Sequence, residues 1–358
     1  MIKYILNKTV YALLTLFGVV TVIFFLFNVL PGDPAQMMLG QNEDSEQIAA
    51  VKAKYGFDKS ISTQYLYYLN DVSPLSFHST NVQDYTYLKD GKYTATSLFT
   101  IGATTTVLKF PYLRESFTKQ GKKVSQVIGE TLPNTAVLAV SAIFIAIVLG
   151  VFLGIISALF KDKWLDKTIQ IFSTLGMSVP SFFSAILFAW FFGYILHKYT
   201  NLEMTGSLYE LDDFGERMNI KWKNLILPAI VLGIRPLAVV IQLMRNSLLE
   251  VFNQDYIRTA RAKGLSEFQI ITRHAVKNAL NPVVTAISGW FASMLAGAVF
   301  VEYIFGWNGL GKEIVNALNT LDLPVIMGSV LVIALLFIII NIFVDVIYGW
   351  LDPKVKLD

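Results

Sequence analysis

The sequence predicts an all-α membrane protein with several transmembrane helices. Of its 358 residues, 54% are hydrophobic and only 15% are charged, whereas soluble domains usually carry about 25% charged residues. Six stretches are long and apolar enough to cross a bilayer, which takes about 20 residues at 1.5 Å per helical residue. These predicted spans are residues 9–30, 132–160, 168–197, 224–244, 278–301 and 323–344.

The composition excludes several other classes of protein. A mean hydropathy of +0.54 excludes intrinsic disorder, and a net charge of +3 is too small to indicate nucleic-acid binding. There is no cysteine, which excludes disulfides and thiolate metal sites. The three histidines, His78, His197 and His274, are too far apart to form the His-x-x-x-His pair of a zinc hydrolase. We therefore predict no metal site.

The first span could be mistaken for a cleaved signal peptide, because Lys3 and Lys8 precede it. Its 22 apolar residues exceed the about 7–15 residues of a signal-peptide core, and no small-x-small cleavage site follows. Instead, Pro31-Gly32-Asp33-Pro34 ends the stretch abruptly. We interpret residues 9–30 as a retained transmembrane helix.

The distribution of lysine and arginine predicts the orientation. With the N-terminus in the cytoplasm, the inner side holds thirteen of these residues and the two short outer loops hold five. The sequence therefore predicts a multi-pass protein of the cell membrane with both termini in the cytoplasm. The long polar stretch at 31–131, here called the outer segment, would lie outside.

The outer segment contains eight of the sixteen tyrosines. We expect short helices at 48–54 and 64–69, and strands in the threonine-rich stretch 91–110. Two roles are open. The segment could shield the helix ends, or it could be a docking surface for an extracytoplasmic partner, which exposed tyrosines favour only weakly.

The inner stretch 245–277 has an ordered pattern rather than that of a linker. The sequence predicts a helix at residues 253–263. Glycine often ends a helix, and Gly264 stands directly after this one. Ser266 and Gln269 have the spacing of a capping box, which predicts that a second helix follows the glycine turn.

Three further features of this inner stretch suggest protein docking. Leu265 and Ile270 stand at the positions of a hydrophobic staple. Ala260 and Gly264 are four residues apart, so we expect a shared small face that another backbone could approach. Basic residues surround this face: Arg258, Arg261 and Lys263. A basic loop obeying the positive-inside rule, or a basic membrane-surface helix, would also explain the charges.

Residues 255–266, DYIRTARAKGLS, resemble the EAA loop of ABC importer permeases, in the form found in the dipeptide/oligopeptide subfamily. Further similarities lie at 30–34, 130–135, 305–311 and 322–324, and at Asn341, Asp345, Tyr348 and 352–354. The sequence departs from the family at 79–117, which look inserted, and at Lys354, where arginine is usual. The resemblance assigns ATPase coupling to Asp255, Tyr256, Arg258, Thr259, Ala260, Arg261, Ala262, Lys263, Gly264, Leu265 and Ser266.

The resemblance implies a six-helix permease similar to those of type I ABC importers, with a large extracytoplasmic segment. Its parts would be 1–30 (tail and first helix), 31–131 (outer segment) and 132–358 (five-helix core), with the coupling loop at 245–277. Such a subunit works with a second, similar permease, two cytoplasmic ATPases and an extracytoplasmic binding protein. The expected function is ATP-driven import, of dipeptides or oligopeptides by this subfamily resemblance.

We expect that the chain is not an enzyme and binds no cofactor itself, since ATP and Mg²⁺ are used by the ATPase partner. The nearest approach to a phosphate-binding loop is 306–313, where Glu313 replaces the hydroxyl that would hold Mg²⁺. We predict no catalytic residues, because neither a Gly-x-Ser-x-Gly motif nor a metal-ligand cluster is present.

Arg235 falls within the fourth predicted span, next to Pro236. A mid-bilayer arginine costs at least about 2.5 kcal/mol, so it should face water or a partner. It could lie on the translocation path and bind a substrate carboxylate. Alternatively, it could form an ion pair with Glu302 or with an acid of the sister subunit.

Smaller signals concern helix packing. Gly150 and Gly154 predict close contact between helices, and Gly176 and Pro180 predict a bend in the third span. Asp345, near the inner end of the sixth span, is expected to be structural or interfacial.

Other functions remain as alternatives. The same architecture imports nickel, glutathione or sugar oligomers in related systems. An ion-coupled secondary transporter would require acids within the spans and internal repeats, and we find neither. An intramembrane enzyme lacks a plausible Ser/His or metal constellation.

Overall fold

The computed structural model describes residues 2–29, 35–36, 45–88, 92–212 and 216–351. The chain forms two compact units: Met1–Glu130 with Ile314–Leu335, the first unit, and Thr131–Glu313 with Leu336–Asp358, the second unit. The start of the last helix therefore belongs with the outer segment rather than with the predicted core. The motif matches at 30–34 and 352–354 lie outside the described residues, as do the side chains of Asp345 and Tyr348.

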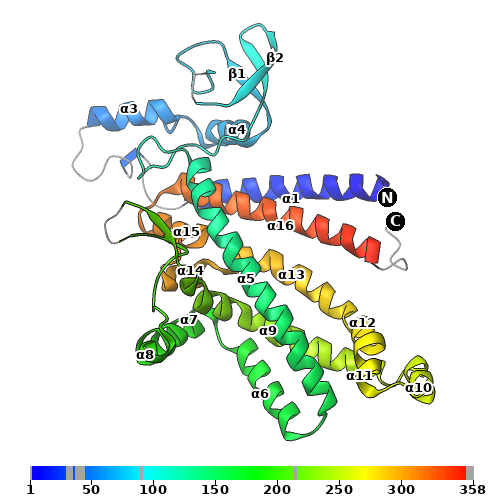
Figure 1. Cartoon of the computed structure of the whole chain (residues 1–358). Coiled ribbons are helices and arrows are strands. Elements are labelled where there is room, and N and C mark those ends of the chain that lie inside the picture. The colour runs from blue at the N-terminus through cyan, green and yellow to red at the C-terminus, as the bar shows by residue number, and fades with distance from the viewer. Residues whose placement is uncertain (1, 30–34, 37–44, 89–91, 213–215, 352–358) are drawn as a thin grey trace. The chain divides into compact units, whose positions relative to one another are not determined.

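The first unit combines long membrane helices with a small mixed region (Figure 1). The outer segment contains both expected helices, which are longer than predicted, and the expected strands. β1 was missed, because its five residues lack a clear threonine-rich pattern. The elements of this unit are α1 (Ile2–Val29), α3 (Ser45–Tyr55), α4 (Ile61–Val72), β1 (Leu75–Ser79), β2 (Ala95–Ile101), β3 (Thr104–Lys109), the start of α5 (Val124–Leu159), the end of α15 (Leu310–Asn319) and the first part of α16 (Leu323–Leu351).

The three strands form an antiparallel sheet of order β1-β3-β2. Adjacent residues alternate between its faces. The buried face carries Ser76, His78 and Val107, whereas Phe77 and Leu108 lie on the other face and are exposed. The sheet thus presents apolar side chains outward, which is typical of an interaction surface when they are contiguous.

Asp322 joins α16 to the outer segment. Its carboxylate accepts hydrogen bonds from the Ser116 hydroxyl, from the backbone N–H of Phe117 at 3.1 Å and from the Thr118 hydroxyl at 2.8 Å. It also accepts from the N–H of Val325 at 3.4 Å, which makes it the N-cap of α16. The Asp-Leu-Pro motif therefore starts a helix and anchors the outer segment to it.

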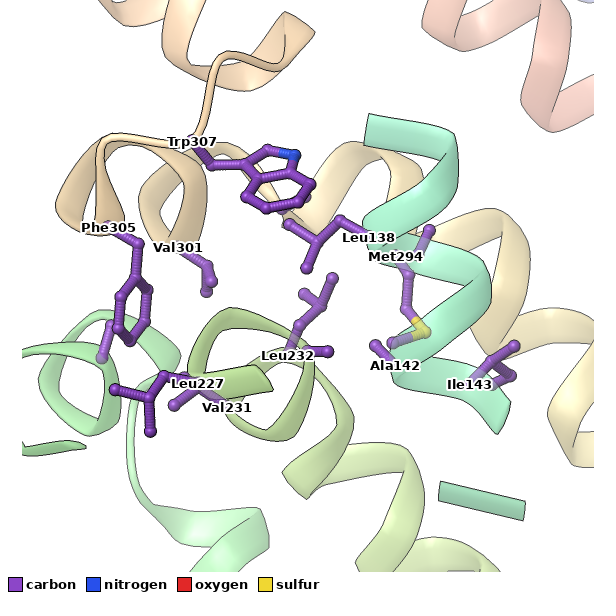
Figure 2. Close-up of a cluster of buried hydrophobic side chains, with 14 of the residues drawn as sticks. Leu138, Ala142, Ile143, Leu227, Val231, Leu232, Met294, Val301, Phe305 and Trp307 are labelled. Carbon is purple, nitrogen blue, oxygen red and sulfur yellow. The ribbon is translucent and has the colours of Figure 1, made fainter. Parts of the chain in front are cut away.

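The second unit is built from helices with one small hairpin. In Figure 2, Leu138 and Leu232, from two different helices, converge with Trp307, which lies in the loop at 306–309, in the larger apolar core of this unit. The main elements are the rest of α5, α6 (Trp164–Ser178), α7 (Ser181–Trp190), η1 (Phe191–Ile195), α8 (His197–Thr200), β4 (Tyr209–Leu211), β5 (Met218–Ile220), α9 (Lys223–Val251), α10 (Asp255–Ala262), α11 (Glu267–Ile270), η2 (Ile271–Ala275), α12 (Val276–Ala279), α13 (Asn281–Gly297), α14 (Val299–Phe305), the start of α15 and the second part of α16.

Four described helices are long and apolar enough to cross a membrane, and a bent pair raises this to five. They correspond to the first, second, fourth and sixth predicted spans, and the bent pair α6–α7 corresponds to the third. The fifth predicted span, 278–301, is divided among α12, α13 and α14. Its longest piece, α13, has 17 residues and begins with a proline in its first turn, where the missing N–H is tolerated.

Two predictions about helix packing are confirmed. A Cβ on Gly150 would lie 2.6 Å from Val240, and one on Gly154 would lie 2.7 Å from Met244, so these glycines let α5 approach α9 closely. α6 and α7 meet at an angle of 111° around Val179–Pro180. Proline keeps the preceding residue out of helical conformation, and Val179 is extended at φ −79°, ψ 132°.

Candidate functional site

The inner stretch 245–277 folds as a helix, a glycine turn and a second helix. α10 ends one residue before the turn, and Gly264 has a φ of +77°, a conformation that side chains with a Cβ rarely adopt. The capping box is present: the Gln269 N–H donates to the Ser266 hydroxyl at 3.4 Å, and the Ser266 N–H donates to the Gln269 side chain at 3.1 Å. The predicted local structure of this candidate coupling loop is confirmed.

One face of the loop is anchored in the second unit. Ile257 and Ile270 are fully buried beside Leu248 of α9, and Leu265 packs against the same cluster. Ala260 is also buried there, with 5% of its surface exposed. The expectation that Ala260 and Gly264 form one small face open to a partner is therefore wrong. Helix α10 buries its apolar side in a cluster to which α9, α11 and α12 also contribute, and Ala260 lies on that side.

The opposite face of the loop is exposed and basic. It presents Asp255, Tyr256, Arg258, Thr259, Arg261, Ala262, Lys263, Gly264 and Ser266. Beside them, Phe268 is 75% exposed. Sequence reasoning used Phe268 only as a position inside the capping box. An aromatic residue two positions after a helix N-cap is the signal that could have drawn attention to Phe268, because exposed aromatic residues often anchor interfaces.

An ion pair bridges the glycine turn. Arg261 of α10 donates to Glu267 of α11 from Nε at 2.9 Å and from Nη2 at 3.3 Å. Hydrogen bonding to this carboxylate raises the pKa of Arg261. Both side chains are largely exposed, so the pair contributes at most about 1 kcal/mol. Its geometric effect is to connect the two helices across the turn.

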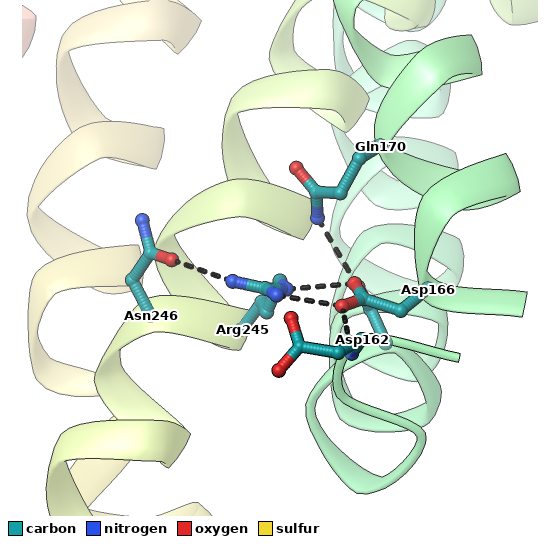
Figure 3. Close-up of polar contacts among 6 residues, drawn as sticks. Asp162, Asp166, Gln170, Arg245 and Asn246 are labelled. Carbon is teal, nitrogen blue, oxygen red and sulfur yellow. Dashed lines mark hydrogen bonds and ion pairs between the residues drawn. The ribbon is translucent and has the colours of Figure 1, made fainter. Parts of the chain in front are cut away.

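A buried ion pair lies where α9 approaches the loop (Figure 3). Arg245 of α9 donates to Asp166 of α6 from Nε at 2.7 Å and from Nη2 at 2.6 Å. Asp166 also accepts from the Ser157 hydroxyl at 2.5 Å and from the Asp162 N–H at 2.9 Å. Sequence reasoning counted Arg245 only as one of the inner charges. No local pattern indicated a partner 79 positions away.

Arg235 lines a small cavity of about 100 Å³ where α6, α7, α9 and α13 meet. Ser181, Ser184 and Ser293 supply hydroxyl groups to the same cavity. Among the described residues, no carboxylate lies within ion-pair distance of Arg235, so the alternative of an ion pair with Glu302 is not realised in this chain. The guanidinium is exposed in the single chain.

Glu302 instead caps α15. Its buried carboxylate accepts from the N–H of Gly311 at 2.7 Å and from the N–H of Lys312 at 3.2 Å. A Cβ on Gly309 would overlap this carboxylate, and one on Gly311 would lie 2.5 Å from the Val299 Cα. Gly309 and Gly311 thus leave room for the Glu302 carboxyl group at the N-terminus of α15.

Two motifs noted in the sequence are in direct contact. The Trp307 indole donates to the backbone oxygen of Asn134 at 3.0 Å, and the Leu310 N–H donates to the Thr135 hydroxyl at 2.8 Å. The Asn134 side chain donates to the backbone oxygen of Asn308 at 2.7 Å. Hydrogen bonds therefore hold the stretches 130–135 and 305–311 together.

Comparison with known families decides the class of this protein. Residues 150–357 match the family described as the binding-protein-dependent transport system inner membrane component. Residues 1–76 match the N-terminal region of the same kind of membrane component. The chain belongs to this family. As a member, it is a multi-pass membrane permease component.

Full-length relatives of this permease component are known from several bacteria. It is 33% identical to a putative peptide permease protein of Brucella suis over 100% of both chains. It is 31% identical to the dipeptide transport system permease protein DppB of Alkalihalophilus pseudofirmus, over 99% of this chain and 100% of the relative. The DppB protein of Bacillus subtilis is also 31% identical, over 100% of this chain and 99% of the relative.

Among solved structures, the permease component is similar to a chain of the inward-facing MetNI methionine ABC transporter. The TM-score is 0.49 at 16% sequence identity, and the match covers 64% of this chain and 97% of that chain.

Proposed function

We propose that this chain is one permease subunit of an ATP-driven importer, and that its substrates are dipeptides or oligopeptides. The full-length relatives are named peptide or dipeptide permeases, which supports this substrate class. The observation that carries the mechanism is the candidate coupling loop, whose apolar side is anchored to α9 while its basic side and Phe268 are exposed.

The proposed assembly contains a second permease, two cytoplasmic ATPases and an extracytoplasmic binding protein. ATP and Mg²⁺ bind to the ATPases, and this chain binds neither them nor nucleic acid. It crosses the cell membrane six times with both termini in the cytoplasm, and the divided fifth span, α12 to α14, supplies one crossing. The outward apolar face of the β1-β3-β2 sheet supports a role of the outer segment in contacting other components.

In the proposed mechanism, the exposed face of α10 and α11 docks in a groove of the ATPase. Closure of the two ATPases around ATP moves two such loops together, a rigid-body switch that opens the membrane helices outward. The movement requires a stiff loop. The capping box, the Arg261–Glu267 pair and the burial of Ile257 all oppose bending.

Movement of the loop also has a defined route into the membrane helices. α10 and the end of α9 contribute Ile257 and Leu248 to one apolar cluster. At that end, Arg245 holds α9 to α6 through Asp166. Beyond this pair, α6 leads to the 111° bend beside Arg235. A shift of α9 would therefore reach the cavity that we assign to the translocation path.

We assign Arg235 to substrate contact on that path. Peptides carry a terminal carboxylate, and the guanidinium, with no carboxylate partner among the described residues, offers a strong charge-assisted donor set. Replacing Arg235 with glutamine should lower the maximal uptake rate about tenfold, whereas Arg235→Lys should retain most of it. Equal uptake by the wild type and Arg235→Gln would remove Arg235 from the path.

The decisive experiment is purification of the chain from native membranes in mild detergent, followed by reconstitution. A second permease and ATPases should co-purify, and vesicles supplied with the binding protein should take up labelled dipeptide when loaded with ATP. Transport of nickel or glutathione in its place would retain the importer and overturn the peptide assignment. A chain that purifies alone and drives uptake from an ion gradient would overturn the importer itself.

Gly264 tests the coupling loop within that assay. Valine strains the backbone at φ +77° and adds bulk to the exposed turn, whereas asparagine tolerates this conformation. Gly264→Val should abolish dipeptide-stimulated ATP hydrolysis while the protein still inserts, and Gly264→Asn should retain part of it. Normal transport by Gly264→Val would show that this loop does not dock the ATPase.

A further inference from the structure

A cavity of about 320 Å³ lies within the second unit, between α5, α6 and α9. All three belong to the helices that are long and apolar enough to cross a membrane, α6 as part of its bent pair. Aliphatic and aromatic side chains form most of the lining; among them are Leu153 of α5, Phe172 of α6 and Ile241 of α9. A molecule that enters this cavity would therefore come from the lipid rather than from water.

The cavity is reached from the surface of α6. Phe172 lines it and is 69% exposed, and its neighbours Ile171 and Leu175 are exposed as well. Ligand pockets in proteins usually measure about 300–1,000 Å³, and an apolar cavity of about 150 Å³ already holds benzene. The volume between α5, α6 and α9 therefore suits a small molecule with an alkyl chain of medium length and not a whole phospholipid.

One buried hydroxyl group at this cavity lacks a hydrogen-bond partner. Ser173 of α6 lines the cavity and is 3% exposed, and its Oγ makes no hydrogen bond among the described residues. A helical serine or threonine can donate to the carbonyl four residues earlier. Thr174 and Ser178 of the same helix do so, at 2.9 Å to the Gln170 oxygen and 2.8 Å to the Thr174 oxygen. The Ser173 hydroxyl is left for a bound molecule.

The lining decides which kind of molecule could be that partner. Among the described residues, Thr168 is the other polar side chain of the lining, and no charged side chain takes part. A buried water usually needs about three polar partners, and Thr168 stands about 7.5 Å from Ser173 along the axis of α6. A plain hydrocarbon would leave the Ser173 hydroxyl unpaired, and an ionised headgroup would have no counter-charge. An uncharged molecule with an alkyl body and one polar group fits the lining.

This cavity adjoins the one that contains Arg235. Gly176 of α6 and Ile234 of α9 line both cavities. These two residues are in close contact, since a Cβ on Gly176 would lie 2.9 Å from the Ile234 side chain. The contact forms part of the wall between the cavities, and Ile234 directly precedes Arg235 in α9. A molecule that fills the cavity beside Ser173 would therefore oppose a movement of α6 against α9 that needs this space.

We propose that this cavity binds an uncharged amphiphile from the bilayer, with its alkyl body between α5, α6 and α9 and one hydroxyl group hydrogen-bonded to Ser173. Bound there, the molecule holds α6 and α9 in one arrangement beside the Arg235 cavity and so inhibits uptake. The binding is independent of what the permease transports. The inhibition rests on the proposed import function, so the two are tested by separate measurements.

The binding test uses the full chain in lipid nanodiscs and a diazirine derivative of octanol as the photolabel. Labelling should occur in the peptides that contain residues 168–176 and 234–241. Octanol should prevent this labelling at a lower concentration than octane, which lacks the hydroxyl group. In Ser173→Ala, the octanol concentration for half protection should rise about 3- to 10-fold, and that for octane should not change. Ser178→Ala removes a hydroxyl that already bonds to its own helix, so this matched control should behave as the wild type does.

Thermal unfolding provides a second readout of the Ser173 hydroxyl. Ser173→Ala should unfold at the wild-type temperature or above it, because the variant loses a buried group that has no partner. A lower unfolding temperature would show that the hydroxyl is already bonded inside the protein and would overturn the site. Equal protection by octanol and octane, or labelling spread over all apolar helices, would overturn it as well.

Uptake by reconstituted vesicles tests the inhibition. Octanol should inhibit the wild type at about 3- to 10-fold lower concentration than it inhibits Ser173→Ala. Equal inhibition of the two proteins, together with labelling that depends on Ser173, would overturn the link to the Arg235 cavity and retain the binding site. A chain that transports nothing would contradict the proposed import function, and the labelling would still decide whether the amphiphile binds.

Discussion

Arg245 on α9 makes a two-pronged hydrogen-bonded ion pair with Asp166 on α6, and Asp166 also accepts the hydroxyl of Ser157 on α5. Three helices therefore meet at one carboxylate. Gln170 extends the network by donating to the Ser157 hydroxyl at 3.1 Å. The arrangement fixes the end of α9 from which the candidate coupling loop emerges.

Removing the Asp166 charge should destabilise the second unit. Asp166→Asn leaves a largely buried Arg245 without its counter-charge, which typically costs about 3–5 kcal/mol. We expect a clear decrease in thermal unfolding temperature in detergent. Asp58→Asn removes a carboxylate from an exposed pair with Lys59 and should have little effect. Similar decreases in both variants would show that the buried pair has no special role.

Phe268 should matter for association and not for folding. Its side chain is exposed, so Phe268→Ala removes little internal packing. Loss of an aromatic anchor typically costs about 1–2 kcal/mol of binding, which predicts about 5- to 30-fold weaker recovery of the ATPase. Quantitative co-purification measures this, with Phe77→Ala in the outer segment as the control. Unchanged recovery with Phe268→Ala would place the interface elsewhere.

Glu302 and Gly309 should act as one structural unit. Glu302→Gln weakens the side-chain cap of α15 and should lower the free energy of unfolding by about 0.5–1.5 kcal/mol. Gly309→Ala places a methyl group against the same carboxylate and should also destabilise the protein. Chemical unfolding of single and double variants should show a combined loss smaller than the sum. Strict additivity would contradict their direct contact.

The first unit should become more stable as the pH rises from 7.5 to 9.5. Burial lowers the pKa of Lys109 from 10.5 to about 8, with Asp71 opposing the shift. Between these values the unfolded chain binds more protons than the folded one, so stability increases with pH, by about 2 kcal/mol over this range. The unfolding temperature of Lys109→Met should rise less than that of the wild type. Parallel curves would show that Lys109 is not buried as a cation.

The sequence by itself determined the features that depend on neighbouring residues. Hydropathy located the long helices, because a long apolar stretch needs a nonpolar environment whichever helices it later packs against. Gly264 and the Ser266–Gln269 capping box were predictable because each satisfies backbone groups within a few residues. The family resemblance rested on these same local stretches.

Only the tertiary structure decided which partner each polar group found. Asp322, Glu302 and Asp166 were visible in the sequence, but their partners depend on how distant helices pack, which no local pattern encodes. The same reason explains the error at Ala260. Helical spacing placed it on a face with Gly264, whereas the apolar cluster that α10 shares with α9 buried Ala260 and left Gly264 and Phe268 exposed. Whether a charged residue is paired, or a small residue is buried, depends on which helices pack around it, and that packing is established only when the chain folds.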